Sequence, residues 1–282
     1  MAIRAFYRLI VATTFCLFCA MLVFSASTRC NAQVTIAQIS DTHLGEPRAP
    51  HAAENLRKAV EMVNESHPDA VVLSGDIGEK PEDWEEARSI LKAVRAPLYY
   101  VPGNHDVHTH DVAKYRSVFG EDYYRFRVKS VDFLVIDSQL LGNYERYEAA
   151  SPLPLPEDTV RESQRMMDWL RKQKEKSKDV LIGIQHIPLV RDGSFPDPKP
   201  YWVISEPYRS QELDLLRELD IKHMLVGHWH NGRVFDAEGI TWHVAPATSW
   251  LPWGGQLGFA LHRIAKDGQV STEFVYLPGA QP

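Results

Sequence analysis

Five short apolar runs of this chain end directly in polar side chains that bind metal ions or carry protons. The runs are rich in Val, Ile and Leu, which is typical of buried strands, and helical segments separate the first three. This alternation predicts a parallel sheet with crossover helices. Because carboxyl ends of parallel strands share one edge, we expect the polar side chains to meet there. They are Asp41 and His43, Asp76, Asn104 and His105, His186, and His228 and His230, after predicted strands 34–39, 69–73, 98–101, 180–184 and 222–226.

Taken singly, each of these strand ends also has an ordinary structural explanation. Gly103-Asn104-His105 fits a plain tight turn in which Asn adopts the left-handed conformation. A lone histidine after a strand is more often a structural residue than a ligand. Independent accidents do not place Asp, Asn and His after five successive strands, so the complete set indicates a functional site.

The rest of the chain predicts more strands than helices. Residues 123–136 are expected to form a hairpin, and residues 233–277 a group of strands with Gly and Pro turns. Segments 143–156 and 191–207 predict irregular loops. No repeat or low-complexity tract divides the chain, so we expect one α/β domain over residues 33–282.

Residues 1–32 are predicted to be a signal peptide. Arg4 and Arg8 precede an apolar stretch over 9–26, and Cys30-Asn31-Ala32 provides small residues for cleavage after Ala32. We therefore expect an exported protein, secreted or periplasmic. The alternative is a retained N-terminal membrane anchor, because the apolar stretch is just long enough to span a bilayer. N-terminal sequencing of the purified protein would distinguish the two.

The cysteine content and net charge of the mature domain limit the classes of partner that it can bind. All three cysteines lie in the predicted leader, so the mature chain has none and depends on its core for stability. Removing the leader also removes three arginines and no acids, which leaves 28 basic and 37 acidic residues and a net charge of −9. Such a surface repels polyanions, which argues against nucleic acid and anionic membranes as partners.

The seven candidate ligands predict a two-metal site. Two carboxylates, one amide oxygen and four imidazoles, with no thiolate, suit Mn²⁺, Fe²⁺ or Zn²⁺. They are too many for one ion with open coordination positions. Shared between two divalent ions, with one carboxylate bridging, they would form a site able to promote in-line displacement at phosphorus.

As an ordered set, Asp41-x-His43, Gly75-Asp76, Gly103-Asn104-His105-Asp106, His186 and Gly227-His228-x-His230 resemble the calcineurin-like metallophosphoesterase superfamily over about residues 36–277. The resemblance implies a β-sandwich flanked by helices on both faces. It also implies roles for the motif residues. These are Asp41, His43 and His230 as ligands of one metal, Asn104, His186 and His228 as ligands of the other, Asp76 as the bridge, and His105 as an unliganded acid.

Within this superfamily, three regions are most similar to the group of calcineurin-like phosphoesterase domain-containing protein 1, which are phosphoprotein phosphatases. These regions are 135–139, 185–189 and 225–232. His186-x-Pro188 and 102–106 are also similar to bacterial cyclic-nucleotide phosphodiesterases. One departure is Ile77-Gly78-Glu79-Lys80, which lacks the second acid and the arginine that follow the bridging aspartate in the main protein serine/threonine phosphatases.

The expected activity is hydrolysis of a phosphoester by a hydroxide bridged between two metal ions, with His105 protonating the leaving oxygen. Phosphomonoesters, including phosphoproteins, are the first choice of substrate, and cyclic nucleotides or other phosphodiesters are the alternative. A remote alternative is a non-catalytic binding module on the same fold. Phe195, Trp202, Trp250 and Trp253 could form an aromatic rim that selects the substrate, although core packing also explains them.

Overall fold

The computed structural model describes residues 32–107, 112–174 and 180–282. The predicted leader lies outside these residues except for Ala32, the first residue of strand β1. Within the described residues, no helix is both long and apolar enough to cross a membrane.

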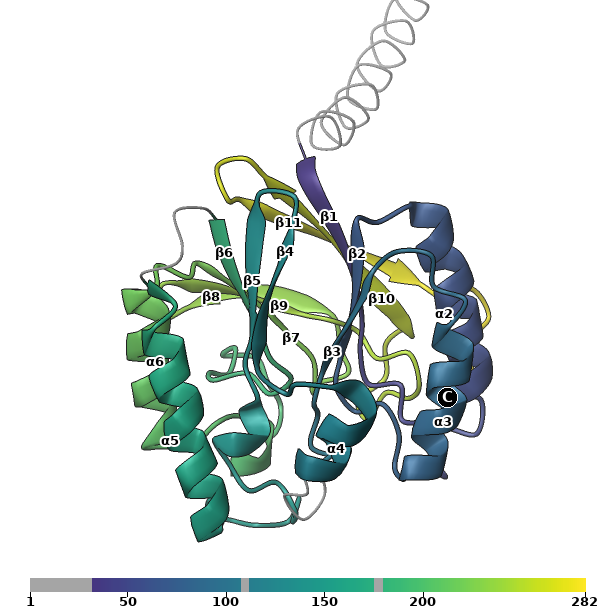
Figure 1. Cartoon of the computed structure of the whole chain (residues 1–282). Helices are drawn as coiled ribbons and strands as arrows, with labels where there is room; N and C mark the ends of the chain where they lie inside the picture. Colours follow the sequence, from purple (N-terminus) through teal and green to yellow (C-terminus); the bar gives the residue numbers. More distant parts are fainter. Residues whose placement is uncertain (1–31, 108–111, 175–179) are drawn as a thin grey trace, which may run out of the picture.

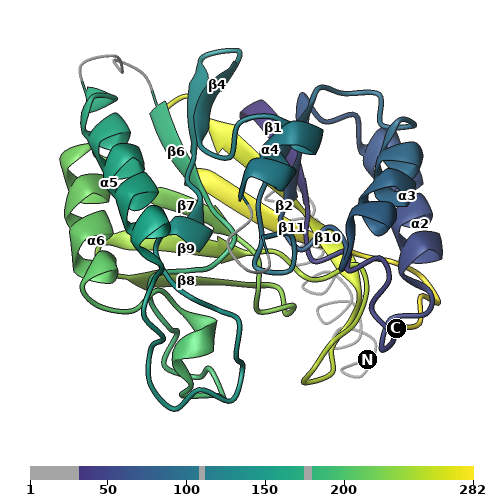
Figure 2. The same ribbon diagram turned by 60° about the horizontal axis from the view of Figure 1, so that its bottom comes forward.

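Two mixed sheets face each other, and helices cover their outer sides (Figures 1 and 2). The first sheet has the order β11 (Val270–Tyr276), β10 (Gly258–Ala265), β1 (Ala32–Ile39), β2 (Ala70–Ser74) and β3 (Leu98–Val101). The second has the order β4 (Tyr124–Val128), β5 (Val131–Val135), β6 (Val180–Ile184), β7 (His223–Val226), β9 (Ile240–Val244) and β8 (Arg233–Ala237). This arrangement confirms the predicted α/β fold with a central sandwich and flanking helices.

The helices lie in two groups on opposite sides of the sandwich (Figure 2). Helices α2 (Ala52–Ser66) and α3 (Pro81–Leu91) connect the parallel strands of the first sheet, as predicted from the alternation of strands and helices. Helices α5 (Glu157–Arg171) and α6 (Tyr208–Glu218) lie beside the second sheet, and the short α4 (Val112–Phe119) follows β3. Two 3₁₀ turns, η2 (Ser138–Leu140) and η4 (Pro200–Trp202), lie in the connecting loops.

One prediction about the sheet is wrong. The five strands that carry the site residues do not belong to a single sheet, because β1, β2 and β3 lie in the first and β6 and β7 in the second. Both groups are internally parallel. The carboxyl ends of both groups lie at the same end of the sandwich, so the candidate ligands still meet, but they do so between two sheets.

The interior between the sheets is mainly apolar among the described residues, and one line of polar side chains crosses it. Val34, Ile36, Phe133 and Ile184 are among its fully buried apolar residues. A continuous hydrogen-bonded chain also crosses this interior, joining His223 to His243, both His243 and His262 to the Thr272 hydroxyl, His262 to Gln38, and Gln38 to the Ser74 hydroxyl. Burial lowers the pKa of all three histidines, so they act here as neutral hydrogen-bonding groups near neutral pH.

Helix α6 buries an acid with no hydrogen-bond partner among the described residues. Both carboxylate oxygens of Glu212 lack a partner, and the side chain is fully buried. Burial raises the pKa of Glu212 from 4.5 to about 8. Protonation of an acid with a raised pKa favours folding, and this contribution is lost as the pH rises from about 4.5 towards 8.

Replacing Glu212 with Gln should therefore stabilise the protein at pH 9 and change its stability much less at pH 5. Urea unfolding at the two pH values measures the difference in free energy of unfolding. Glu218→Gln is the matched control, because Glu218 lies exposed at the end of the same helix. A gain in stability that is the same at both pH values would show that Glu212 is not a buried titrating acid.

Candidate metal centre

Most of the candidate ligands lie in turns with left-handed backbone conformation. Within the described residues, nine non-glycine residues have positive φ, and five of them belong to the predicted site. These five are Asp41, His43, Asp76, His228 and His230, with φ between 40° and 68°. This conformation is uncommon for residues with a Cβ atom, and its concentration here indicates that the turns are shaped to aim side chains at one point.

Two glycines let these turns pack against each other. A Cβ atom on Gly75 would lie 2.4 Å from the Nδ1 atom of His186. One on Gly103 would lie 2.2 Å from the backbone nitrogen of Asp76. Any larger residue at either position would push the loops apart, which explains why glycine precedes both Asp76 and Asn104.

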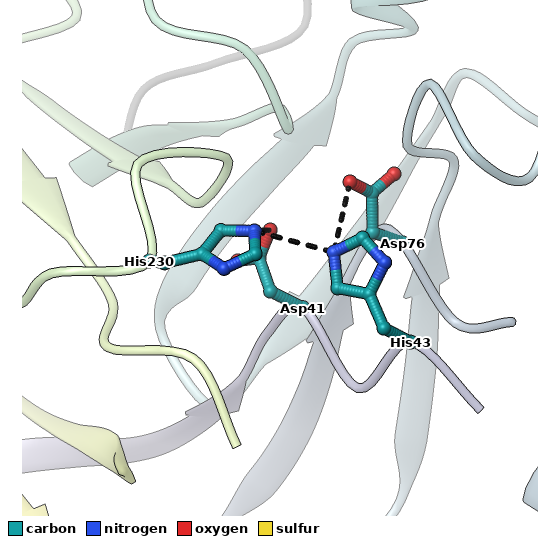
Figure 3. Close-up of side chains that lie close together, drawn as sticks. All are labelled: Asp41, His43, Asp76 and His230. Atoms are coloured by element: carbon teal, nitrogen blue, oxygen red, sulfur yellow. Dashed lines mark hydrogen bonds and ion pairs between the residues drawn. The ribbon is translucent and has the colours of Figure 1, made fainter. Parts of the chain in front are cut away.

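Four of the predicted ligands form a first cluster (Figure 3). The Nε2 atom of His230 lies 3.3 Å from the Oδ1 atom of Asp41 and 3.2 Å from the Nε2 atom of His43. The Nε2 atom of His43 lies 3.4 Å from the Oδ2 atom of Asp76. One carboxylate or imidazole atom of each residue thus faces a common centre, which suits a divalent cation.

A second cluster shares Asp76 with the first. It contains Asp76, His186 and His228, and the Nε2 atom of His186 lies 3.2 Å from the same Oδ2 atom of Asp76. Asn104 is also buried here, and its Oδ1 atom has no hydrogen-bond partner in the described structure. The unpaired amide oxygen is a suitable additional ligand for a metal in this cluster.

Each of the four candidate ligand histidines has one ring nitrogen held by an acceptor outside the clusters. The pairs are His43 Nδ1 with Glu79 Oε1 at 2.9 Å, His186 Nδ1 with the Ser74 carbonyl at 2.7 Å, His228 Nε2 with the Tyr201 carbonyl at 2.9 Å, and His230 Nδ1 with the Trp250 carbonyl at 2.8 Å. A nitrogen that donates to such an acceptor fixes the tautomer, so the other nitrogen keeps its lone pair for a metal. The donor set therefore fits two divalent ions.

The hydroxyl of Tyr201 orients Asn104. It accepts a hydrogen bond of 2.8 Å from the side-chain Nδ2 atom of Asn104. This contact fixes the amide so that Oδ1 is the atom left for the site. Tyr201 thus holds two candidate ligands, Asn104 through its hydroxyl and His228 through its carbonyl, and sequence analysis missed it because it lies in an irregular loop.

Glu79 corrects a second expectation. The segment 77–80 was expected to lack an equivalent of the second acid of the main protein serine/threonine phosphatases. Glu79 nevertheless reaches the site, and its two oxygens contact Nδ1 of His43 at 2.9 Å and Nδ1 of His105 at 2.8 Å. Glu79 thus links a candidate ligand with the candidate acid. Its position three residues after Asp76 was the available signal, and only the fold shows that its side chain turns back toward the site.

Asp106 fastens two of the site loops together. Its Oδ2 atom accepts from the backbone N–H of Gly103 at 2.9 Å, and its Oδ1 atom accepts from that of Ile77 at 2.8 Å. Burial and the nearby charge of Asp76 raise the pKa of Asp106 to about 7. The last residue of the Gly-Asn-His-Asp motif therefore positions the loops and does not join the ligand clusters.

The electrostatics of the clusters keep the ligand carboxylates ionised. Burial alone would raise the pKa of Asp41, but the charges of His230 and His186 lower it to about 2. The pKa of Asp76 is lowered well below its usual value because His186 and His105 outweigh burial in the same way. For His105, burial is outweighed by the charge of Asp76 and the hydrogen bond to Glu79, which raise its pKa to about 9.

Five of the seven candidate ligands, all except Asp41 and His186, form the floor of an open pocket of about 470 Å³. His105 lines this pocket together with members of both clusters, and Trp202, Trp250 and Trp253 line it as well. Phe195 is not among the lining residues and packs against Trp253 at a ring separation of 5.3 Å. The predicted aromatic rim is therefore present in three of its four members.

Comparison with known proteins agrees with this geometry. The chain is 30% identical over 188 residues to human serine/threonine-protein phosphatase CPPED1, covering 61% of this chain and 57% of the human protein. It is 26% identical over 251 residues to a probable cyclic nucleotide phosphodiesterase of Rhodococcus erythropolis, covering 79% of this chain and 75% of that protein. The chain thus spans little more than half the length of the CPPED1 proteins that it matches.

A solved structure and a family model also match this chain. A dimetal phosphatase from Danio rerio has the same fold, with a TM-score of 0.66 at 16% identity, over 88% of this chain and all of that one. The model of the family described as calcineurin-like phosphoesterase matches residues 34–232, which include every candidate ligand. This chain belongs to the calcineurin-like phosphoesterase family.

Proposed function

We propose that this protein is a phosphoester hydrolase that depends on two divalent metal ions. The observation that carries the proposal is the shared position of Asp76, whose Oδ2 atom lies 3.4 Å from His43 in one cluster and 3.2 Å from His186 in the other. A single carboxylate between two sets of oriented imidazoles suits a pair of ions better than one ion. Family membership supports the same conclusion.

The residues divide into two ligand sets. Asp41, His43 and His230 would hold one ion, Asn104, His186 and His228 the other, and Asp76 would contribute to both. When bound, Mn²⁺, Fe²⁺ or Zn²⁺ at these positions would supply Lewis acidity toward a phosphoryl oxygen. All seven ligand side chains are buried, and five of them still face the open pocket, where a substrate and water can reach the ions.

His105 is the proposed proton donor. It lines the pocket beside the clusters, and Glu79 holds its Nδ1 atom. This hydrogen bond fixes the ring, so that the Nε2 atom is the one that can deliver a proton to a leaving oxygen. Glu79 acts through His105 and His43 and is therefore a positioning residue.

The charged side chains around the pocket affect the preference between phosphomonoesters and phosphodiesters. Among the described residues, Arg48 is the only arginine or lysine that lines it, and Glu46 binds its guanidinium through contacts of 2.8 and 2.9 Å. Within the described part of the chain, no unpaired guanidinium lines the pocket, so the metal ions and loop residues would have to hold the second charge of a phosphomonoester. We therefore expect a relaxed preference, in which phosphomonoesters are hydrolysed best, as in the named function of CPPED1, and phosphodiesters are also hydrolysed to a measurable extent.

The purified protein, supplied with Mn²⁺, Fe²⁺ or Zn²⁺, should hydrolyse an aryl phosphate monoester and, more slowly, a diester with the same leaving group. Values of kcat/KM for the matched pair measure the preference. Turnover confined to cyclic nucleotides would make the phosphodiesterase assignment correct instead. No turnover of any phosphoester with any of the three metals would favour the non-catalytic binding module.

Two histidine variants separate metal binding from proton transfer. His230→Ala should lower bound metal and activity together, because it removes a ligand. His105→Asn should leave metal content near that of the wild type and slow turnover by roughly 10²- to 10⁴-fold, the usual value of a positioned proton donor. Metal analysis and kcat measure the two effects. Equal metal loss in both variants would instead identify His105 as a ligand.

Tyr201→Phe tests the orientation of Asn104. The variant removes the hydroxyl that holds the amide but keeps the backbone carbonyl that holds His228. We expect the dissociation constant of one of the two ions to rise by about tenfold, as for other residues that orient metal ligands. Competition with a chelating dye measures both constants. Tyr147→Phe is the matched control, because the Tyr147 hydroxyl donates to Asp197 and contacts no candidate ligand.

A further inference from the structure

The walls of the candidate active-site pocket are mainly aromatic. Six rings line it, and five of them form a connected series in which each ring packs against the next. The six are Tyr144, Tyr147, Tyr201, Trp202, Trp253 and Trp250. The connected series runs from Tyr144 to Tyr201 (6.3 Å), Tyr147 (5.3 Å), Trp202 (5.8 Å) and Trp253 (4.8 Å) between ring centroids. Trp250 lies separately beside His230, at 4.8 Å.

Two of these rings are unusually exposed. Within the described residues, five large apolar side chains are classed as exposed, and Tyr147 at 40% and Trp253 at 38% are two of them. Both line the mouth of the same pocket. Exposed aromatic surface that gathers at a pocket, instead of scattering over the molecule, is typical of a binding site.

The exposed rings are held in place by their neighbours. Trp253 packs against Trp202 at 4.8 Å and against Phe195 at 5.3 Å. The Tyr147 hydroxyl donates to Asp197 at 2.7 Å. A ring that is already fixed loses little conformational entropy when a ligand packs on it, so these two side chains are prepared for binding.

The pocket offers little to a second charged group on the substrate. Glu46 neutralises Arg48, whose guanidinium also lies 4.2 Å from the centre of the Trp250 ring. Among the described lining residues, the remaining charged side chain of the outer wall is the acid Glu145. Lys199, whose ammonium lies 3.7 Å from the centre of the Tyr147 ring, is paired with Glu148. The walls therefore suit an uncharged group and disfavour a substrate with further acidic groups beside the phosphate.

From these observations we infer that the substrate carries a flat, uncharged aromatic ring close to its phosphoester, and that Trp253 is a specificity-determining residue that packs against this ring. Aromatic pairs gain from ring geometry in addition to the area they bury. The inference rests on the proposed phosphoester hydrolase function and names the substrate class for it.

A matched pair of ligands tests the inference without confusing it with leaving-group chemistry. Benzyl phosphate and cyclohexylmethyl phosphate both release a primary alcohol and have the same number of carbon atoms, but only the first has a flat ring. The saturated ring is the more hydrophobic of the two, so apolar burial alone would favour it. We expect kcat/KM to be about two- to tenfold higher for benzyl phosphate, in line with the usual value of aromatic packing.

The corresponding phosphonates measure binding separately from catalysis. Benzylphosphonate and cyclohexylmethylphosphonate cannot be hydrolysed at an ester, and calorimetry gives their dissociation constants for the metal-loaded protein. We expect benzylphosphonate to bind more tightly by a similar factor. A second pair, adenosine 5′-monophosphate and ribose 5-phosphate, shows whether a ring farther from phosphorus, as in a nucleotide, is also preferred.

Variants of Trp253 identify the residue responsible. Trp253→Leu should abolish the preference for the benzyl compounds, and Trp253→Phe should retain most of it because a ring remains. Tyr276→Leu is the control, since Tyr276 is exposed to a similar extent, at 40%, but does not line the pocket. The wild-type comparison still decides the inference if Trp253→Leu does not fold.

Equal kcat/KM for benzyl and cyclohexylmethyl phosphate, together with equal dissociation constants for the two phosphonates, would overturn this inference while leaving the hydrolase function intact. Absence of turnover for every ester would overturn the proposed function, and the phosphonate comparison would then still decide whether a ring is recognised. A preference that persists in Trp253→Leu would show that Trp253 does not determine it.

Discussion

The structure of this site depends on burying two carboxylates, Asp41 and Asp76, at one point between two sheets. Ionised carboxylates are costly to bury unless positive charge accompanies them. Positive charge on histidines from both sheets lowers the pKa of these acids. Each ligand imidazole also donates to an acceptor outside the clusters, so its second nitrogen faces inward and can bind a metal when it carries no proton. Divalent cations complete the charge balance of such a site, which is why the donor set is intelligible as a metal centre.

The sandwich provides the rigidity that this arrangement needs. Five site residues adopt left-handed backbone conformations, which other parts of the fold must stabilise. Strands β2 and β7 and residues 36–39 of β1 are buried, and Asp106 ties the loop after β2 to the loop after β3. The polar line between the sheets ends at the Ser74 hydroxyl, and the Ser74 carbonyl holds His186. Interior packing and ligand orientation are thus parts of one network.

The floor and the walls of the pocket have different chemistry. The floor is polar, buried and built from turns that follow strands, whereas the walls are aromatic and come largely from the two irregular loops. Tyr201 belongs to both, because its ring lines the pocket while its hydroxyl and carbonyl orient Asn104 and His228. The loops therefore have two functions, to position ligands and to shape the space above them.

The sequence by itself determined the strands and the residues that follow them, because period, Gly and Pro are local signals read within a few residues. It therefore predicted all seven candidate ligands and His105. Only the tertiary structure decided that the strands divide between two sheets and that Glu79 turns back to His105. It also decided which nitrogen of each histidine faces inward. These features depend on contacts such as that between His186 and Ser74, 112 residues apart, which local periodicity does not encode.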